Sequence, residues 1–358
     1  MPSLKEIKGR INSISSTLAI TSAMKMVAAA KLQKAQMAIQ NMLPYERRLH
    51  SMLIDLMGAM NISAAASEDG SVRGSGSAER GFDQSGDRLS LSNRHDLAGM
   101  DGAYSLMAQR EVRKVAIVAF ASNSSLCGAF NSNVIREATA VINEYRASGL
   151  GDADITVYSV GRKMAEAMKK LGFPSPADFT KMSDSPSYEA ASALAQELLD
   201  GFVSGRFDKV ELVYNHYKST SSQPTIRQTY LPLSLADATA DIQVGKITDS
   251  ASESDTNRGA EPVGAPVVRQ GSPTTEDLIV EPSKEALIAT LLPKVIRLRI
   301  FTTLLDSAAA EHAARTVAMQ LATDNGNDLL QELTLEYNKG RQQKITSEIL
   351  DLVGGSMQ

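Results

Sequence analysis

The sequence predicts an α/β protein in which a long antiparallel coiled coil of N- and C-terminal helices carries a small α/β domain. Three observations predict this fold class. A hydrophobic period near 3.5 residues runs through residues 1–62, and a second long helical pattern fills 283–358. Between them, residues 111–245 alternate strand-like and helical patterns. Polar stretches at 63–110 and 246–282 separate these three parts.

The N-terminal segment is predicted to form one helix. Ser3 and Glu6 have the spacing of a capping box, in which each side chain can satisfy a free amide of the first turn. At 1.5 Å per residue the helix would be roughly 85 Å long, and Pro44 is expected to bend it or mark a boundary. Glu46 interrupts the coiled-coil seam. The seam residues are Leu4, Ile7, Ile11, Ile14, Leu18, Thr21, Lys25, Ala28, Leu32, Ala35, Ile39, Met42, Leu49, Leu53, Leu56 and Met60.

The C-terminal segment is predicted to be the partner of this helix. Ser283 can cap it, Pro293 is a candidate kink, and Gly354 and Gly355 should end it. Alanines are frequent in 308–322, as they are at 28–30, and such small residues let two backbones approach closely. The inward-facing candidates are Ile288, Leu292, Val295, Leu305, Ala309, Met319, Leu330, Leu333, Tyr337, Ile345 and Ile349.

The middle of the chain is predicted to be a small, Rossmann-like α/β domain. Nearly continuous apolar runs at 114–122 and 154–161 are typical of strands buried on both faces. Polar residues alternate in 210–218 and 225–233, which places these two strands toward an edge of the sheet. The expected helices cover residues 133–147, 163–171 and 188–203. The Gly-, Ser- and charge-rich stretches 63–103 and 246–276 are expected to be flexible loops.

Composition excludes several classes of protein. The net charge of −4 and pI near 5.7 give no general case for nucleic-acid binding. Residues 1–50, however, are basic, which suits an acidic partner surface or a solvated helix face. The single cysteine, Cys127, excludes an intramolecular disulfide and a multi-cysteine metal site. We expect neither a secretory signal nor a transmembrane helix, which needs roughly 18 apolar residues.

The motifs of enzymes are weak. The turn "NSSLCGAFNSN" follows a predicted strand and precedes a helix, as at a phosphate site, but Gly128 is its only glycine and no nucleotide-binding motif occurs in the chain. The alternative is a plain strand-to-helix turn with Asn131 or Ser132 capping the helix. Cys127 could be a nucleophile with a histidine base, although a buried thiol is favoured. No spacing predicts a metal site or a cofactor, so the chain is interpreted as an interaction protein.

Four stretches carry a resemblance to a known family. They are "LKEIKGRINSISSTLAITSAMKMVAAAKLQKAQ", "LCGAFNSN", "SAAAEHAARTVAMQLATDN" and "YNKGRQQKITSEILDLVGG". Together they resemble the gamma subunit family of F-type ATP synthases. The resemblance implies a central rotor stalk whose coiled coil lies in the bore of a hexamer of alpha and beta subunits. Its α/β domain would be a foot on the membrane ring of c subunits, beside epsilon.

The resemblance also implies a division of labour. Ion flow would turn the ring and the stalk, while catalysis would reside on the beta subunits and this chain would not be an enzyme. The implied location is the cytoplasmic face of a bacterial inner membrane, peripheral to it. The sequence does not specify the coupling ion (proton or sodium), the size of the c-ring, the direction favoured in the cell or the role of the two insertions.

Five residues match positions where the family couples to beta and alpha: Met24, Lys25, Arg315, Gln342 and Thr346. Lys25, with Lys31 and Lys34, would meet the acidic lever of beta. The alternatives are that Met24 packs against the opposite helix and that Arg315 is a solvated helix residue.

The chain also departs from the family. Uncharged residues occupy 123–125, where the family commonly has a charged pair, and both insertions are longer than expected. Cys127 alone excludes the redox switch of plastid members. Two other functions remain open from the residues themselves: a nucleotide-dependent α/β enzyme with a coiled-coil arm, and a static coiled-coil scaffold.

Overall fold

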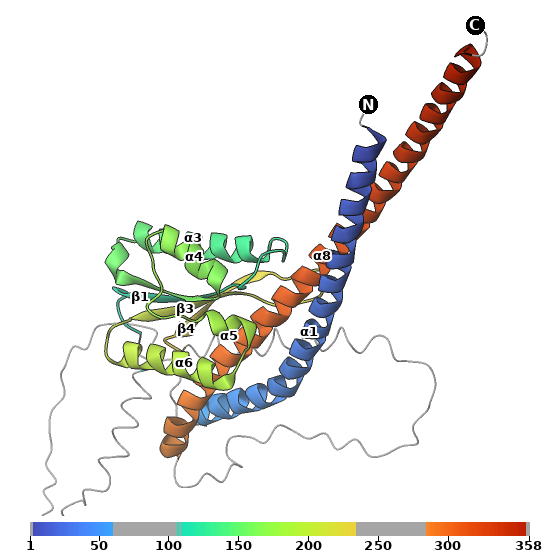
Figure 1. The fold of residues 1–358 in the computed structure, drawn as a ribbon. Coiled ribbons are helices and arrows are strands. Elements are labelled where there is room, and N and C mark those ends of the chain that lie inside the picture. The colour runs from blue at the N-terminus through green and yellow to red at the C-terminus, as the bar shows by residue number, and fades with distance from the viewer. Residues whose placement is uncertain (1–2, 60–105, 107–108, 234–283, 356–358) are drawn as a thin grey trace, which may run out of the picture.

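The computed structural model describes residues 3–59, 106, 109–233 and 284–355 (Figure 1). The expected flexible loops 63–103 and 246–276 lie outside these residues, as does Ser283. Along the chain the elements are α1 Leu4–Ala59, β1 Val115–Phe120, α3 Phe130–Ala147, a 3-10 turn Asp152–Asp154, β2 Ile155–Val160, α4 Arg162–Lys170, α5 Thr180–Asp184, α6 Tyr188–Val203, β3 Lys209–Asn215, β4 Thr225–Leu231 and α8 Lys284–Gly355.

Helices α1 and α8 run antiparallel side by side (Figure 1) and are called the rod below. The register is fixed by a hydrogen bond from Thr323 Oγ1 to Thr21 Oγ1 (3.1 Å) and by the close approach of Leu18 to Gly326. A Cβ at Gly326 would lie 2.6 Å from Leu18 Cδ2, so glycine permits this approach. All predicted seam residues whose side chains are described are at least partly buried, which confirms the predicted hairpin.

Details of α1 can be compared with the predictions. Pro44 lies inside α1 and so marks no boundary, but Figure 1 shows the lighter-blue part of the helix turning away from the rod axis, which agrees with the predicted bend. Glu46 is partly buried and accepts a hydrogen bond from Thr302 Oγ1 (3.1 Å). At the helix start, Glu6 N donates to Ser3 Oγ (3.3 Å), as in a capping box, while the Glu6 carboxylate pairs with Arg10 (2.7 Å).

The last part of α8 has no partner helix among the residues that the structure describes. Leu4, at the start of α1, lies beside Gly340, and Figure 1 shows α8 continuing well past that point. The prediction that Ile345 and Ile349 face inward is therefore wrong: their exposed fractions are 47% and 54%. Helical periodicity continues through these positions, but α1 is too short to cover them.

The described residues 109–233 form the sheet domain. Its strand order is β2-β1-β3-β4, with β1 parallel to β2 and β3 and with β4 antiparallel to β3. This confirms the predicted α/β class and the edge position of β4. β3 lies between β1 and β4, so it is next to the edge strand and not itself at the edge. Its alternating polar residue Glu211 is buried in ion pairs with Lys209 and Arg227 rather than exposed to solvent.

The hydrophobic core lies on both faces of the sheet (Figure 1). Helices α3 and α4 cover one face through residues such as Val134 and Met164. The other face packs against α6 and also against α8, which contributes Leu292, Ile296 and Ile300 to the same cluster. Each large apolar side chain buried in this way contributes about 1.5–3 kcal/mol. The rod and the sheet domain therefore share one core.

Close packing of the rod predicts that enlarging a buried alanine destabilises the chain. Ala309 is fully buried against Leu32 on α1, so Ala309→Leu should lower the free energy of unfolding by about 1–3 kcal/mol through overpacking. Denaturant titration followed by circular dichroism measures this. Ala322→Leu, at an exposed position of the same helix, is the matched control. Equal effects of the two substitutions would contradict the tight interface.

Candidate functional site: the junction between the rod and the sheet domain

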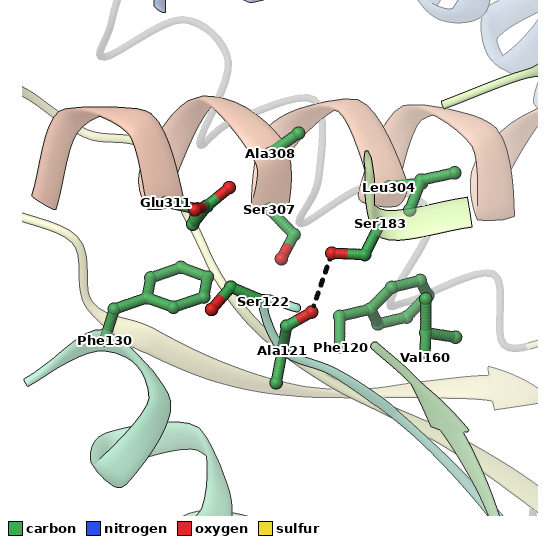
Figure 2. A pocket seen from close by; sticks show the side chains of 10 residues that line it. All are labelled: Phe120, Ala121, Ser122, Phe130, Val160, Ser183, Leu304, Ser307, Ala308 and Glu311. Atoms are coloured by element: carbon green, nitrogen blue, oxygen red, sulfur yellow. Dashed lines mark hydrogen bonds between the residues drawn. The ribbon is translucent and has the colours of Figure 1, made fainter. Parts of the chain in front are cut away.

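The carboxyl ends of the parallel strands face α8 rather than an open crevice. Open α/β sheets usually bind ligands at this end. In Figure 2, Ser307 and Glu311 of α8 lie over Ser122 and Phe130, which follow β1, and Leu304 of α8 lies on the side of Phe120 and Val160. The cavity left between them is about 10 Å³, which is about the space of one water molecule. The place where a nucleotide would bind in such a sheet is thus filled by the rod.

The backbone at this end is tightly packed as well. Gly161, at the end of β2, has a φ of 96°, and a Cβ there would lie 2.0 Å from the carbonyl oxygen of Ala121. That carbonyl also accepts a hydrogen bond from Ser183 Oγ at 2.9 Å (Figure 2). Nearby, Asn123 Oδ1 accepts from Arg162 N (2.8 Å), and Asn123 Nδ2 donates to Thr180 O (2.7 Å). The ends of β1 and β2 are therefore bound to each other and to the start of α5.

The turn at 122–129 is held from within. Asn131 Oδ1 accepts from Ser122 N (3.0 Å), and Asn131 Nδ2 donates to Ser122 Oγ (2.8 Å). Helix α3 begins at Phe130 with no side-chain cap, so the prediction that Asn131 or Ser132 caps it is wrong. Asn131 lies within the helix, and its side chain stabilises the turn through these hydrogen bonds to Ser122. Cys127 is buried, as favoured from the sequence, with its Sγ 3.7 Å from Ser122 Oγ.

Arg315 of α8 is hydrogen-bonded to this turn. Its guanidinium donates to Ser125 O and to Ser124 Oγ, both at 2.8 Å, and pairs with Glu311 one helical turn away. Only 11% of each of the Arg315 and Glu311 side chains is exposed. The solvated alternative for Arg315 is therefore wrong: the residue is a buried connection between the rod and the sheet domain.

A second connection follows β3. Asp306 of α8 accepts a hydrogen bond from Tyr217 N (2.9 Å), and its other oxygen lies 2.6 Å from His216 Nδ1. The bond to Asp306 raises the pKa of His216 above its ordinary value of 6.5, against the opposing effects of burial and of Lys218. Tyr217 OH in turn accepts from Gln36 Nε2 of α1 (2.7 Å).

The five predicted coupling residues do not form one site. Met24 and Lys25 are partly buried in the rod, about one helical turn from Thr21 and its partner Thr323. Gln342 and Thr346 are exposed on the end of α8 beyond α1, where Thr346 Oγ1 donates to the Gln342 carbonyl (2.9 Å). Arg315 lies at the junction. The structure thus distributes them along the rod, and none of these placements tests a contact with another subunit.

Sequence reasoning missed the residues that build the junction, chiefly Asp306, His216, Tyr217 and Gln36. One signal was available: Asp306 just before the alanine-rich part of α8, and Glu311 within it, are carboxylates whose neighbouring positions face inward. Charged residues on an inward face need partners. Among the described residues, no group of His, Cys, Asp or Glu could hold a metal ion, and no described helix is long and apolar enough to span a membrane.

The buried Arg315–Glu311 pair predicts a large cost for removing one partner. Arg315→Met removes the permanent cation from the buried Glu311 and leaves it only His312 Nδ1 at 3.4 Å, an imidazole whose pKa is lowered by burial, so the free energy of unfolding should fall by about 3–5 kcal/mol. Arg10→Met is the control, because Arg10 and Glu6 have the same four-residue spacing but are mostly exposed. Chemical denaturation measures both. A small effect for Arg315→Met would show that the pair contributes little.

The His216–Asp306 pair predicts a pH-dependent stability. Because the folded-state pKa of His216 is raised, the stabilisation is fully present below a pH of about 6.5 and is lost as the pH rises through the raised pKa. The measurement is the difference in unfolding free energy between the native chain and Asp306→Asn as a function of pH. This difference should shrink with rising pH. A difference that is constant across the range would mean that His216 does not titrate against Asp306.

Comparisons with known proteins address the chain as a whole. A family model described as "ATP synthase" matches residues 3–357. The chain is 47% identical to the ATP synthase gamma chain of Phocaeicola vulgatus and 45% identical to that of Bacteroides thetaiotaomicron, and each alignment covers 100% of both chains. Its fold is similar to that of a chain in the cryo-EM structure of the Euglena gracilis mitochondrial ATP synthase (TM-score 0.52, 19% identity, 99% of this chain and 93% of that chain covered).

Proposed function

We propose that this chain, which belongs to the gamma chain family of ATP synthases, is a central-stalk subunit that transmits torque between a membrane ring of c subunits and a catalytic hexamer of alpha and beta subunits. On this proposal, residues 1–62 and 283–358 form the shaft and residues 111–245 form the foot. The insertions at 63–110 and 246–282 are assigned no role.

The observation that carries the proposal is the shared core of the rod and the sheet domain. A shaft can deliver torque only if the part that is turned and the part that acts move as one body. Helix α8 is at once half of the rod and one layer over the sheet, and Arg315 and Asp306 bind it to two separate turns of the sheet domain. Torque applied to the sheet domain would therefore reach the rod without passing through a flexible linker.

The rod also has the shape that rotation within a sleeve requires. Small residues keep it narrow, and its far end is a single helix with exposed apolar side chains, including Ile345, Ile349 and Leu352. We assign Gln342 and Thr346 to contacts of this end with the hexamer. Met24 and Lys25 are assigned to the lever of beta, where exposed charge pairs of about 0–1 kcal/mol can break at each step.

Arg315 receives a different role within the same proposal. Its donors are already engaged by Ser124, Ser125 and Glu311. We therefore propose that it couples to the hexamer indirectly, by holding the exposed turn that contains Leu126. In this scheme ATP chemistry resides on the beta subunits and the chain needs no cofactor. It is peripheral to the cytoplasmic face of a bacterial inner membrane, attached through the c-ring and lying beside epsilon.

Reconstitution tests the rotor directly. The chain is assembled with alpha and beta subunits of its own organism and carries a bead on the sheet domain. Cys127 is too buried to label, so the attachment site is Lys170→Cys, an exposed position at the end of α4. We expect ATP-driven rotation of the bead and no hydrolysis by the chain alone. A stable assembly with a stationary bead would indicate a static scaffold, and nucleotide turnover by the isolated chain would indicate an enzyme.

The assignment of Lys25 has its own prediction. Charge reversal by Lys25→Glu should lower the number of ions pumped per ATP hydrolysed while leaving assembly intact, because the attraction to an acidic lever becomes a repulsion. Ion pumping by inverted vesicles containing the whole complex measures this. Lys170→Glu, outside the rod, is the matched control. Unchanged pumping per ATP in Lys25→Glu would remove Lys25 from the coupling path.

A further inference from the structure

We propose that His216 and Tyr217 are positioning residues that clamp the sheet domain to both helices of the rod at one level, so that the two helices turn as a unit. The inference rests on the torque-transmitting function proposed above. The segment 216–217 belongs to no recognised motif. On this proposal it sets the angle between the foot and the shaft.

The segment is first anchored to the sheet. It follows the last residue of β3, Asn215, whose Nδ2 donates to Phe130 O (3.1 Å) and whose Oδ1 accepts from Thr225 Oγ1 (2.6 Å). His216 N then donates to Pro224 O (2.9 Å). Asn215 is buried and has both ends of its amide engaged, so the segment leaves the sheet in a fixed direction.

One carboxylate joins the segment to α8. Asp306 uses one oxygen for Tyr217 N and the other for the imidazole of His216. The His216 and Asp306 side chains are only 24% and 18% exposed, so solvent screens the pair weakly. Two bonds to two oxygens of one planar group fix orientation as well as distance. Rotation of the sheet domain about the rod axis would have to break both.

Tyr217 carries the connection across to α1. Its ring packs against the buried cluster formed by Leu32 of α1 with Ala309 and Ala313 of α8, and its hydroxyl accepts from Gln36. The alanines leave room for the ring at the seam between the helices. A single side chain of the sheet domain therefore contacts both helices at their seam.

This geometry has a mechanical consequence. Torque delivered to α8 alone would tend to twist it relative to α1, and the apolar contacts of the seam resist this without a preferred direction. The segment 216–217, which is hydrogen-bonded to both helices, adds a directional restraint to those of the Thr302–Glu46 and Thr323–Thr21 hydrogen bonds. Besides Asp306, the charged group facing His216 is Lys218 on its own segment, which opposes its protonation, whereas Asp306 on α8 favours it.

The test uses the complex with alpha and beta subunits and the bead at Lys170→Cys, and it measures the angular spread of the bead during pauses. Tyr217→Phe removes only the hydroxyl, and Asp306→Asn removes the negative charge. We expect both to widen the spread while rotation continues. Tyr45→Phe makes the same chemical change at an exposed position of α1 and should leave the spread unaltered.

A pH profile separates clamping from simple loss of structure. In the native complex the spread should widen as the pH rises through the raised pKa of His216. His216→Lys keeps a cation for Asp306, so it should retain the narrow spread and remove the pH dependence. Complexes of Tyr217→Phe and Asp306→Asn that rotate with the native spread would overturn the clamp alone. A native complex that does not rotate would overturn the proposed function and the clamp with it.

Discussion

The structure depends on the double use of helix α8. Its early half buries Leu292, Ile296 and Ile300 against the sheet, and the same helix continues as half of the rod. Any change in the angle between the rod and the sheet domain would separate apolar surfaces, at roughly 25 cal/mol for each Å² exposed. Rigidity between the two parts thus follows from burial of one continuous helix, and no separate hinge region interrupts it among the described residues.

Buried polar contacts add direction to this non-directional packing. A hydrophobic face can be satisfied in several registers, whereas Arg315 must meet Ser125 O and Asp306 must meet Tyr217 N. These charges are costly to bury, and replacing such pairs by apolar residues often does not reduce stability. Their role here is better understood as fixing one angle between the rod and the sheet domain than as adding net stability.

The sequence was sufficient for the elements that obey a simple period. The seam from Leu4 to Leu56, the four strands and the three longer helices of the sheet domain were all predicted to within a few residues. The predictions failed where the position or burial of a residue depends on a partner that is distant in the sequence. The polar residue Glu211 led to the prediction that β3 lies toward an edge, since its ion pair with Arg227 could not be predicted from the sequence. Ile349 was predicted to be buried because the sequence does not show where α1 ends beside α8. The short helix α5 gave no periodic signal.

The candidate site was harder to predict than the fold for the same reason. Arg315 was singled out by resemblance, but its attachment to the turn after β1 depends on contacts across 190 positions of sequence. His216 and Asp306 are 90 positions apart and belong to no motif. Long-range polar pairs of this kind are set by the docking of the rod on the sheet, which period and propensity do not determine.

The uncovered end of α8 has a consequence for the life of the free chain. Leu350, Leu352 and Val353 are 65%, 75% and 50% exposed, on a helix with no neighbour among the described residues. Apolar surface of this kind promotes association with whatever is nearby. A copy of this chain whose α8 tip stays uncovered would therefore be prone to aggregation and proteolysis.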